Sequence, residues 1–232
     1  MHIGGLQKLS LIDYPGKLAA VIFTRGCNFR CPYCHNPELV IPQRYAQPLS
    51  VEDALDYLRD RRFMLDAVVV SGGEPTIHHD LPELLLRIRE LPYLIKLDTN
   101  GSNPVMLERI IQQRYVDYIA MDVKTGLADY EALCRTRFCV GSIRRSVDLI
   151  KNSGIAHEFR TTVVKSLYTE TDMSEISQLI DGCRRYRLQT ARLDNAILDP
   201  ALSAAEDFSP AEFAALCDRW EINTANPEIT QP

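Results

Sequence analysis

The 232-residue sequence has no excess of positive charge, since its formal net charge is −5. Its basic doublets, such as Arg184-Arg185, are scattered along the chain and form no run. Proteins that bind nucleic acid directly use a concentrated basic surface to attract phosphates. The composition therefore argues against nucleic acid as a direct ligand.

Long apolar runs and an export signal are also missing. Residues 1–10 contain no basic segment followed by an apolar stretch, and runs such as 18–23 have only the length of a strand. We expect a cytoplasmic protein without a membrane partner.

The chain shows no internal repeat, low-complexity segment or Gly/Ser linker that would divide it. With 46% hydrophobic residues it can bury a sizeable core. We therefore predict a single domain over residues 1–222, followed by a polar and loosely attached tail over residues 223–232.

Short β-rich runs alternate with amphipathic stretches that carry helix start signals, such as Asn103-Pro104 and the capping box of Ser209 and Glu212. This alternation predicts an α/β fold with a parallel sheet and right-handed crossovers. The chain is short for eight such units, so a partial (β/α)6 barrel is favoured over an open doubly wound sheet. The six expected strands cover residues 18–24, 67–71, 94–98, 118–123, 157–164 and 188–193.

Seven cysteines are present, and three of them fall within eight positions: Cys27, Cys31 and Cys34. An odd number, grouped in this way in a chain without an export signal, suits metal or redox chemistry better than a disulfide framework. We expect the other four to be ordinary thiols in the core or on the surface; they are Cys134, Cys139, Cys183 and Cys217.

The three grouped cysteines form a C-x3-C-x2-C loop directly after the first expected strand. A structural zinc ion would need a fourth ligand, and His35 is poorly placed to reach back to the same ion. A cubane iron–sulfur cluster held by three cysteines leaves one iron without a protein ligand, which is typical of catalytic metal sites. Zinc with a distant fourth ligand stays open as the alternative.

Polar groups also follow the next three expected strands. The second strand ends in Gly72-Gly73-Glu74, a turn whose backbone a ligand can approach closely. The third ends near Asp98 and Asn100, and the fourth near Asp122 and Lys124. Barrels of this kind place their active sites at the carboxyl ends of the strands, so the four clusters are expected to converge there.

The cysteine loop, with Tyr33 before its last cysteine, resembles the signature of the radical S-adenosylmethionine (SAM) superfamily, and Gly-Gly-Glu-Pro resembles that superfamily's motif for the SAM amino group. Over most of the chain the resemblance narrows to glycyl-radical-enzyme activases, and it is closest to the activating proteins of anaerobic ribonucleoside-triphosphate reductase. The stretches that carry it are 10–17, 27–38, 96–101, 118–124 and 158–164.

The resemblance implies one [4Fe-4S] cluster on Cys27, Cys31 and Cys34, because the interval between Cys34 and Gly72 leaves no room for the ferredoxin-like insert of some activases. It also implies a monovalent cation near Asp98 and Asp122. The family can supply a histidine to SAM near the last strand, and in this chain Asn195 is the candidate to take its place. The expected SAM contacts are Tyr33, His35, Gly72, Gly73, Glu74, Asp98, Asn100, Asp122, Lys124 and Asn195.

The expected activity is reductive cleavage of SAM and formation of a glycyl radical on a partner, most closely an anaerobic ribonucleoside-triphosphate reductase, with a flavodoxin- or ferredoxin-like electron donor. Residues 13–17 are candidates for guiding the partner's loop, or else form an ordinary turn. Arg160 is expected to reach SAM or to form a structural ion pair. The alternatives are a radical SAM enzyme for a small molecule, such as a deazapurine synthase, and a non-catalytic zinc protein.

Overall fold

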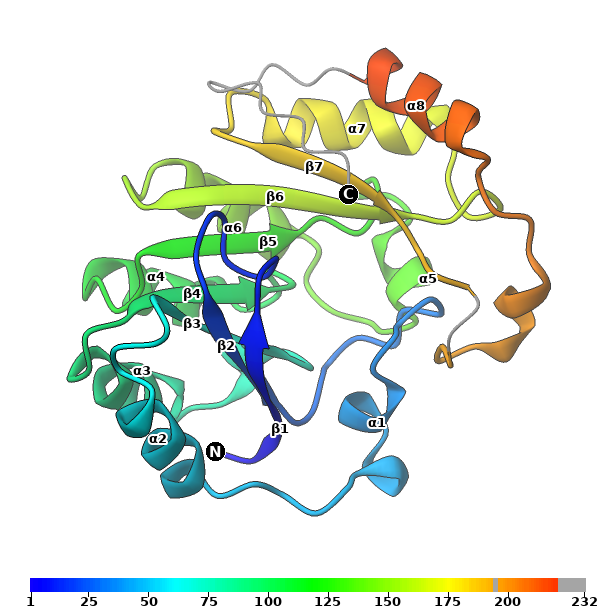
Figure 1. The fold of residues 1–232 in the computed structure, drawn as a ribbon. Coiled ribbons are helices and arrows are strands. Elements are labelled where there is room, and N and C mark those ends of the chain that lie inside the picture. Colours follow the sequence, from blue (N-terminus) through cyan, green and yellow to red (C-terminus); the bar gives the residue numbers. More distant parts are fainter. Residues whose placement is uncertain (194–195, 221–232) are drawn as a thin grey trace.

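A computed structural model describes residues 1–193 and 196–220 of the chain. Within that part, one sheet contains seven strands in the order in which they occur in the sequence (Figure 1). The strands are β1 (Ile3–Ser10), β2 (Ala19–Thr24), β3 (Ala67–Gly72), β4 (Leu94–Thr99), β5 (Tyr118–Asp122), β6 (Ala156–Val163) and β7 (Tyr186–Thr190).

β1 runs antiparallel to β2, and all later neighbours in the sheet are parallel. β1 and β7 are the two edges of the sheet, which therefore stays open. The six parallel strands β2 to β7 confirm the predicted partial (β/α)6 barrel. β1 was not predicted, and the last strand begins at Tyr186, two residues before its expected start.

The helices are α1 (Pro37–Val40), α2 (Val51–Asp60), α3 (Leu81–Arg89), α4 (Pro104–Gln112), α5 (Tyr130–Cys134), α6 (Gly141–Lys151), α7 (Glu170–Ile180) and α8 (Pro210–Arg219). Short 3-10 turns occupy Pro42–Arg44, Pro75–Ile77 and Pro200–Ala204.

Two of the predicted helix starts have the expected chemistry. The Asn103 side chain accepts a hydrogen bond from the backbone of Met106, and Ser209 and Glu212 form a reciprocal capping box. Asp80 precedes α3 without capping it, since its carboxylate pairs with the amino terminus of Met1.

The two faces of the sheet differ because successive side chains of a strand point to opposite sides. On the helix side, residues such as Val68, Ile95 and Ile119 belong to the large hydrophobic core. The inner side has a small apolar cluster that includes Val69, Tyr118 and Ala120. Charged side chains also occupy inner positions: Lys96, Asp98, Asp122, Glu158 and Arg160.

The direction of the strands places the sequence clusters. The carboxyl ends of β2, β3, β4 and β5 lead into the cysteine loop, the Gly72-Gly73 turn, Asn100 and Lys124 respectively. The predicted convergence at one end of the sheet is thus built into the topology. The predicted tail over 223–232 lies outside the described residues.

Candidate active site

A cavity of about 260 Å³ opens at the carboxyl ends of the parallel strands. It is lined by Cys27, Cys31 and Cys34 together with all the other predicted site residues that the structure describes, namely Tyr33, His35, Gly72, Gly73, Glu74, Asp98, Asn100, Asp122 and Lys124. Asn195 lies outside the described residues. One cavity therefore brings together predicted site residues that are as much as 97 positions apart in the sequence, from Cys27 to Lys124.

Backbone hydrogen bonds hold the cysteine loop at its start and in its middle. Gly26 N–H donates to the Leu39 carbonyl at 2.7 Å, and Arg30 N–H donates to the Cys134 carbonyl at 2.8 Å. All seven cysteines are free thiols. Within the described residues, no three His, Cys, Asp or Glu side chains are grouped in a way that would hold a single metal ion.

Burial and hydrogen bonding act differently on two of the three thiols. Burial raises the pKa of Cys27 to about 12, although the backbone N–H of Phe29 opposes this shift. At Cys31 the hydrogen bond with the Cys134 thiol outweighs burial and lowers the pKa to about 7. Cys31 is therefore the more easily deprotonated of these two thiols.

Two backbone hydrogen bonds join the Gly72-Gly73-Glu74 turn to the end of β2 and the start of the cysteine loop. Gly73 N–H donates to the Thr24 carbonyl at 2.9 Å, and Glu74 N–H donates to the Gly26 carbonyl at 2.8 Å. A Cβ on Gly73 would lie 1.9 Å from the Gly26 oxygen, and Gly72 has a φ of +115° that favours glycine. These glycines thus let two loops pack together, in addition to any approach by a ligand.

Glu74 is buried and ties the turn to the end of β4. Its carboxylate accepts hydrogen bonds from Thr76 N–H at 3.0 Å, Thr99 Oγ1 at 2.7 Å and Asn100 N–H at 2.6 Å. Burial raises the pKa of Glu74, and the donors oppose the shift. The predicted contact of Glu74 with SAM stays a prediction, whereas its bracing of these two loops is directly visible.

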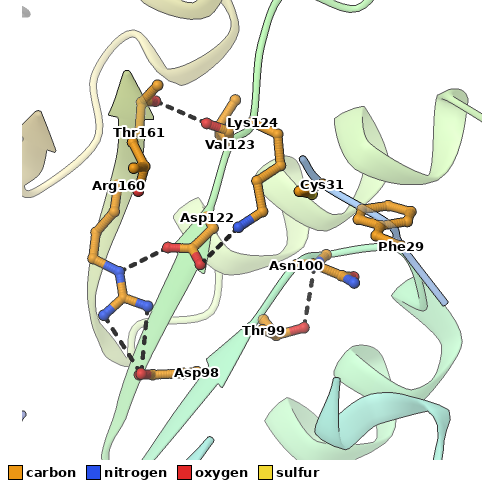
Figure 2. Close-up of polar contacts among 12 residues, drawn as sticks. Phe29, Cys31, Asp98, Thr99, Asn100, Asp122, Val123, Lys124, Arg160 and Thr161 are labelled. Atoms are coloured by element: carbon orange, nitrogen blue, oxygen red, sulfur yellow. Dashed lines mark hydrogen bonds and ion pairs between the residues drawn. The ribbon is translucent and has the colours of Figure 1, made fainter. Parts of the chain in front are cut away.

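A chain of ion pairs crosses the floor of the cavity, as Figure 2 shows. Arg160 Nε lies 2.8 Å from Asp122 Oδ1, and Arg160 Nη2 lies 3.4 Å from Asp98 Oδ2. On the other side of Asp122, Lys124 Nζ lies 3.0 Å from Oδ2. Burial would raise the pKa of Asp122, but Arg160 and Lys124 hold it well below its usual range.

Arg160 occupies the space between the two carboxylates that were expected to share a monovalent cation. Its guanidinium already supplies a positive charge there, which the sequence could not show. The structural alternative that the sequence left open for Arg160 is therefore observed. A free cation at Asp98 and Asp122, which the resemblance implies, would have to share this space with Arg160.

Tyr33 and His35 line the cavity on the cysteine-loop side. Burial raises the pKa of the Tyr33 phenol well above its usual range, and Tyr168 lies beside it. His35 Nε2 accepts a hydrogen bond from Arg192 N–H at 3.1 Å, which ties the cysteine loop to the segment after β7.

The cavity also reaches residues of β6 and β7 that the sequence did not predict as site residues. Thr162, Gln189 and Thr190 line this part, and Gln189 Nε2 donates to Thr162 Oγ1 at 2.8 Å. Thr162 belongs to the stretch 158–164 that carries the family resemblance, but nothing in the sequence singled it out, or Gln189 and Thr190, because a lone threonine or glutamine in a strand is unremarkable. Their position at the carboxyl ends of two further strands was the available signal.

Residues 13–17 lie at the opposite end of the sheet. They connect the end of β1 to the start of β2, the Asp13 carbonyl accepts a hydrogen bond from Lys96 Nζ at 2.6 Å, and the Tyr14 ring packs against Tyr118. None of residues 13–17 lines the cavity. This position favours the ordinary turn over a role in guiding a partner's loop, since the hairpin runs away from the cysteine loop.

The three thiols of the cysteine loop fit an iron–sulfur cluster in which one iron has no protein ligand. Three thiols line the cavity, while the polar groups of β3, β4 and β5 face the same space. Thiolates are the ligands that iron–sulfur clusters use. Cys27, Cys31 and Cys34 would hold the cluster, leaving the remainder of the cavity for a polar ligand such as SAM.

Residues 21–180 match the model of the radical SAM superfamily. A Methanocaldococcus jannaschii protein, provisionally named glycyl-radical enzyme activating enzyme MJ1227, is 35% identical over 193 residues, which cover 81% of this chain and 78% of the relative. The chain belongs to the glycyl-radical-enzyme activases of the radical SAM superfamily. The predicted [4Fe-4S] cluster and SAM are the cofactors of that superfamily.

Other comparisons agree with the assignment of this chain to the radical SAM activases. The pyruvate formate-lyase-activating enzyme of Staphylococcus aureus is 29% identical over 133 residues, which cover 53% of each chain. Among solved structures, Streptococcus suis SuiB bound to SAM has a TM-score of 0.63 at 16% identity and covers 88% of the activase. The activase spans about half the length of SuiB, at 48%, and this likeness shows a shared fold. Within its described residues, no helix is long and apolar enough to cross a membrane.

Proposed function

We propose that this activase installs a glycyl radical on an anaerobic ribonucleoside-triphosphate reductase, and that it takes its electron from a flavodoxin- or ferredoxin-like protein. The observation that carries the proposal is the cavity, which runs from the cysteine loop to β7 at an open edge of the sheet. An extended segment of a folded partner could enter along that edge. The choice of the reductase rests on the resemblance of the stretches described above.

The roles of the residues follow from their chemistry. Cys27, Cys31 and Cys34 hold the cluster, which supplies one electron to the SAM sulfonium when bound. Asp122 and Lys124 present an anion and a cation at one strand end, suited to the ammonium and carboxylate of SAM.

Further SAM contacts are proposed on the other walls of the cavity. Tyr33 and His35 would contact SAM from the cysteine loop, Asp98 and Asn100 from the end of β4, and the Gly72-Gly73-Glu74 turn from the end of β3. Asn195 is proposed as a contact near the last strand.

The reaction requires no general base. Cleavage of SAM by one electron gives methionine and a 5′-deoxyadenosyl radical, which takes a hydrogen atom from the glycine Cα of the partner. The products are 5′-deoxyadenosine and a glycyl radical, so atoms and electrons balance. The protein's part is to position the two reactants and to exclude water.

The test is anaerobic incubation of the reduced, cluster-loaded activase with SAM and purified anaerobic ribonucleoside-triphosphate reductase, read by electron paramagnetic resonance. We expect a doublet organic radical that is lost when the partner's radical glycine is changed to alanine. A radical on pyruvate formate-lyase but none on the reductase would overturn the choice of partner. Consumption of a small molecule without any protein radical would overturn the activase function.

A further inference from the structure

A fourth thiol lies directly behind the cysteine loop. Cys134, the last residue of α5, is fully buried, and its Sγ lies 4.0 Å from the Sγ of Cys31. Cys134 does not line the cavity, whereas Cys31 does. The two sulfurs therefore meet on the side of Cys31 that faces the protein interior, away from the space available to SAM.

Packing fixes the position of this thiol. The rings of Phe29, Tyr130 and Phe138 pack against one another in tilted or edge-to-face arrangements, with Phe29 and Phe138 centroids 4.9 Å apart. Tyr130 also accepts a hydrogen bond from the Lys124 backbone at 3.0 Å, and the Cys134 carbonyl accepts one from Arg30 at 2.8 Å. α5 is thus bound both to the end of β5 and to the middle of the cysteine loop.

Hydrogen-bond donors also reach the sulfur of Cys27. The Phe29 N–H lies 3.4 Å from it, and Asn100 Nδ2 lies 4.0 Å from it. At Cys31 the nearest such group is a side chain, because the thiol of Cys134 lies within hydrogen-bonding distance of the Cys31 sulfur. No sequence pattern singles out Cys134, which is 100 positions from the last cysteine of the loop.

We propose that the Cys134 thiol donates an S–H···S hydrogen bond to the Cys31 thiolate in the cluster-loaded protein, and so raises the reduction potential of the cluster. The inference rests on the proposed role of Cys31 as a cluster ligand. A donor near a ligand sulfur stabilises the reduced cluster more than the oxidised one, because the reduced cluster carries one more negative charge. Cys134 acts through Cys31 and touches neither SAM nor the partner.

The test compares the midpoint potentials of four reconstituted proteins by redox titration monitored by electron paramagnetic resonance. They are the wild type, Cys134→Ala, Cys134→Ser and the control Cys183→Ala, which removes an equally buried thiol that precedes β7 and does not line the cavity. We expect about four irons per chain in all of them. The midpoint potential should shift downward in Cys134→Ala, stay close to wild type in Cys134→Ser, which keeps a donor, and remain unchanged in Cys183→Ala.

If the wild type binds a normal cluster, three results would overturn the role of Cys134 while leaving the proposed function intact. The first is an unchanged potential in Cys134→Ala. The second is an equal shift in the Ala and Ser variants, which would indicate altered packing. The third is loss of iron from both variants while they remain folded by circular dichroism, which would make Cys134 a ligand. A wild type that binds no cluster would instead overturn the ligand assignment on which the inference rests.

Discussion

Arg160 Nε lies 2.8 Å from Asp122 Oδ1, and this contact sets the charge of the cavity floor. The guanidinium also reaches Asp98, so one side chain from β6 joins the carboxylates of β4 and β5. Because Arg160 and Lys124 hold the pKa of Asp122 well below its usual range, we expect this carboxylate to stay ionised between about pH 5 and 8. SAM affinity should therefore show no step in this window that depends on Asp122.

The position of Arg160 predicts that the wild-type protein needs no added monovalent cation at Asp98 and Asp122. SAM affinity, measured by calorimetry, should be the same in potassium chloride and in choline chloride. Arg160→Gln leaves the two carboxylates without their bridge, so its affinity should become dependent on potassium. A wild-type affinity that falls severalfold in choline would show that a free cation is present as well.

Removing the charge of Asp122 should weaken SAM binding while leaving the cluster spectrum unchanged. A hydrogen bond to a charged group contributes about 1.5–3 kcal/mol, so Asp122→Asn should raise the SAM dissociation constant about tenfold or more. Glu108→Gln is the control, since Glu108 pairs with Arg145 on the protein surface, away from the cavity. An unchanged dissociation constant would leave Asp122 with a purely structural role.

Gly73→Ala should disturb the cysteine loop, because the new Cβ would lie 1.9 Å from the carbonyl oxygen of Gly26, the residue before Cys27. We expect a lower iron content after reconstitution and a lower melting temperature. The matched control is Gly141→Ala, where the nearest atom to a new Cβ is 3.8 Å away. Full iron content with a normal melting temperature in Gly73→Ala would contradict the close packing of the two loops.

Glu74→Gln should destabilise the fold. Thr76 N–H donates to one carboxylate oxygen of Glu74 and Asn100 N–H to the other, so the amide NH₂ of glutamine must face one of these donors in either orientation. One unsatisfied buried donor costs about 1–3 kcal/mol of the free energy of unfolding. Urea unfolding measures the loss, with exposed Glu83→Gln as the control. Equal stability of the two variants would show that Glu74 does not brace the loops.

The sequence predicted the parallel strands and the convergence of the site, because strand ends and cysteine spacing are local signals. β1 escaped prediction because its residues include Gly4 and Gly5, which have poor β-propensity. A Cβ on Gly4 would lie 2.3 Å from Leu39 Cδ2, so a tertiary contact with α1 explains a glycine that local propensity disfavours. Such contacts are invisible in the sequence.

The same limit applies to the side chains of the site. Their places at strand ends and the family resemblance identified Asp98 and Asp122, but only the pairing of β4, β5 and β6 shows that Arg160 bridges them. Residues 13–17 are close to the cysteine loop in sequence, because they precede β2 and the loop follows it. They are remote from the loop in space, because the chain enters β2 at the opposite end of the strand. Direction along a strand decides which side of the molecule a neighbouring segment reaches.

The central claim is hydrogen-atom transfer from a partner's glycine to the 5′ carbon derived from SAM, and isotope transfer measures it most directly. The reduced activase is incubated anaerobically with SAM and a reductase in which glycine carries deuterium at Cα, and the 5′-deoxyadenosine is analysed by mass spectrometry. The account predicts one deuterium in the 5′-deoxyadenosine, in proportion to the glycyl radical formed. Unlabelled 5′-deoxyadenosine, formed at the same rate with or without the partner, would contradict it.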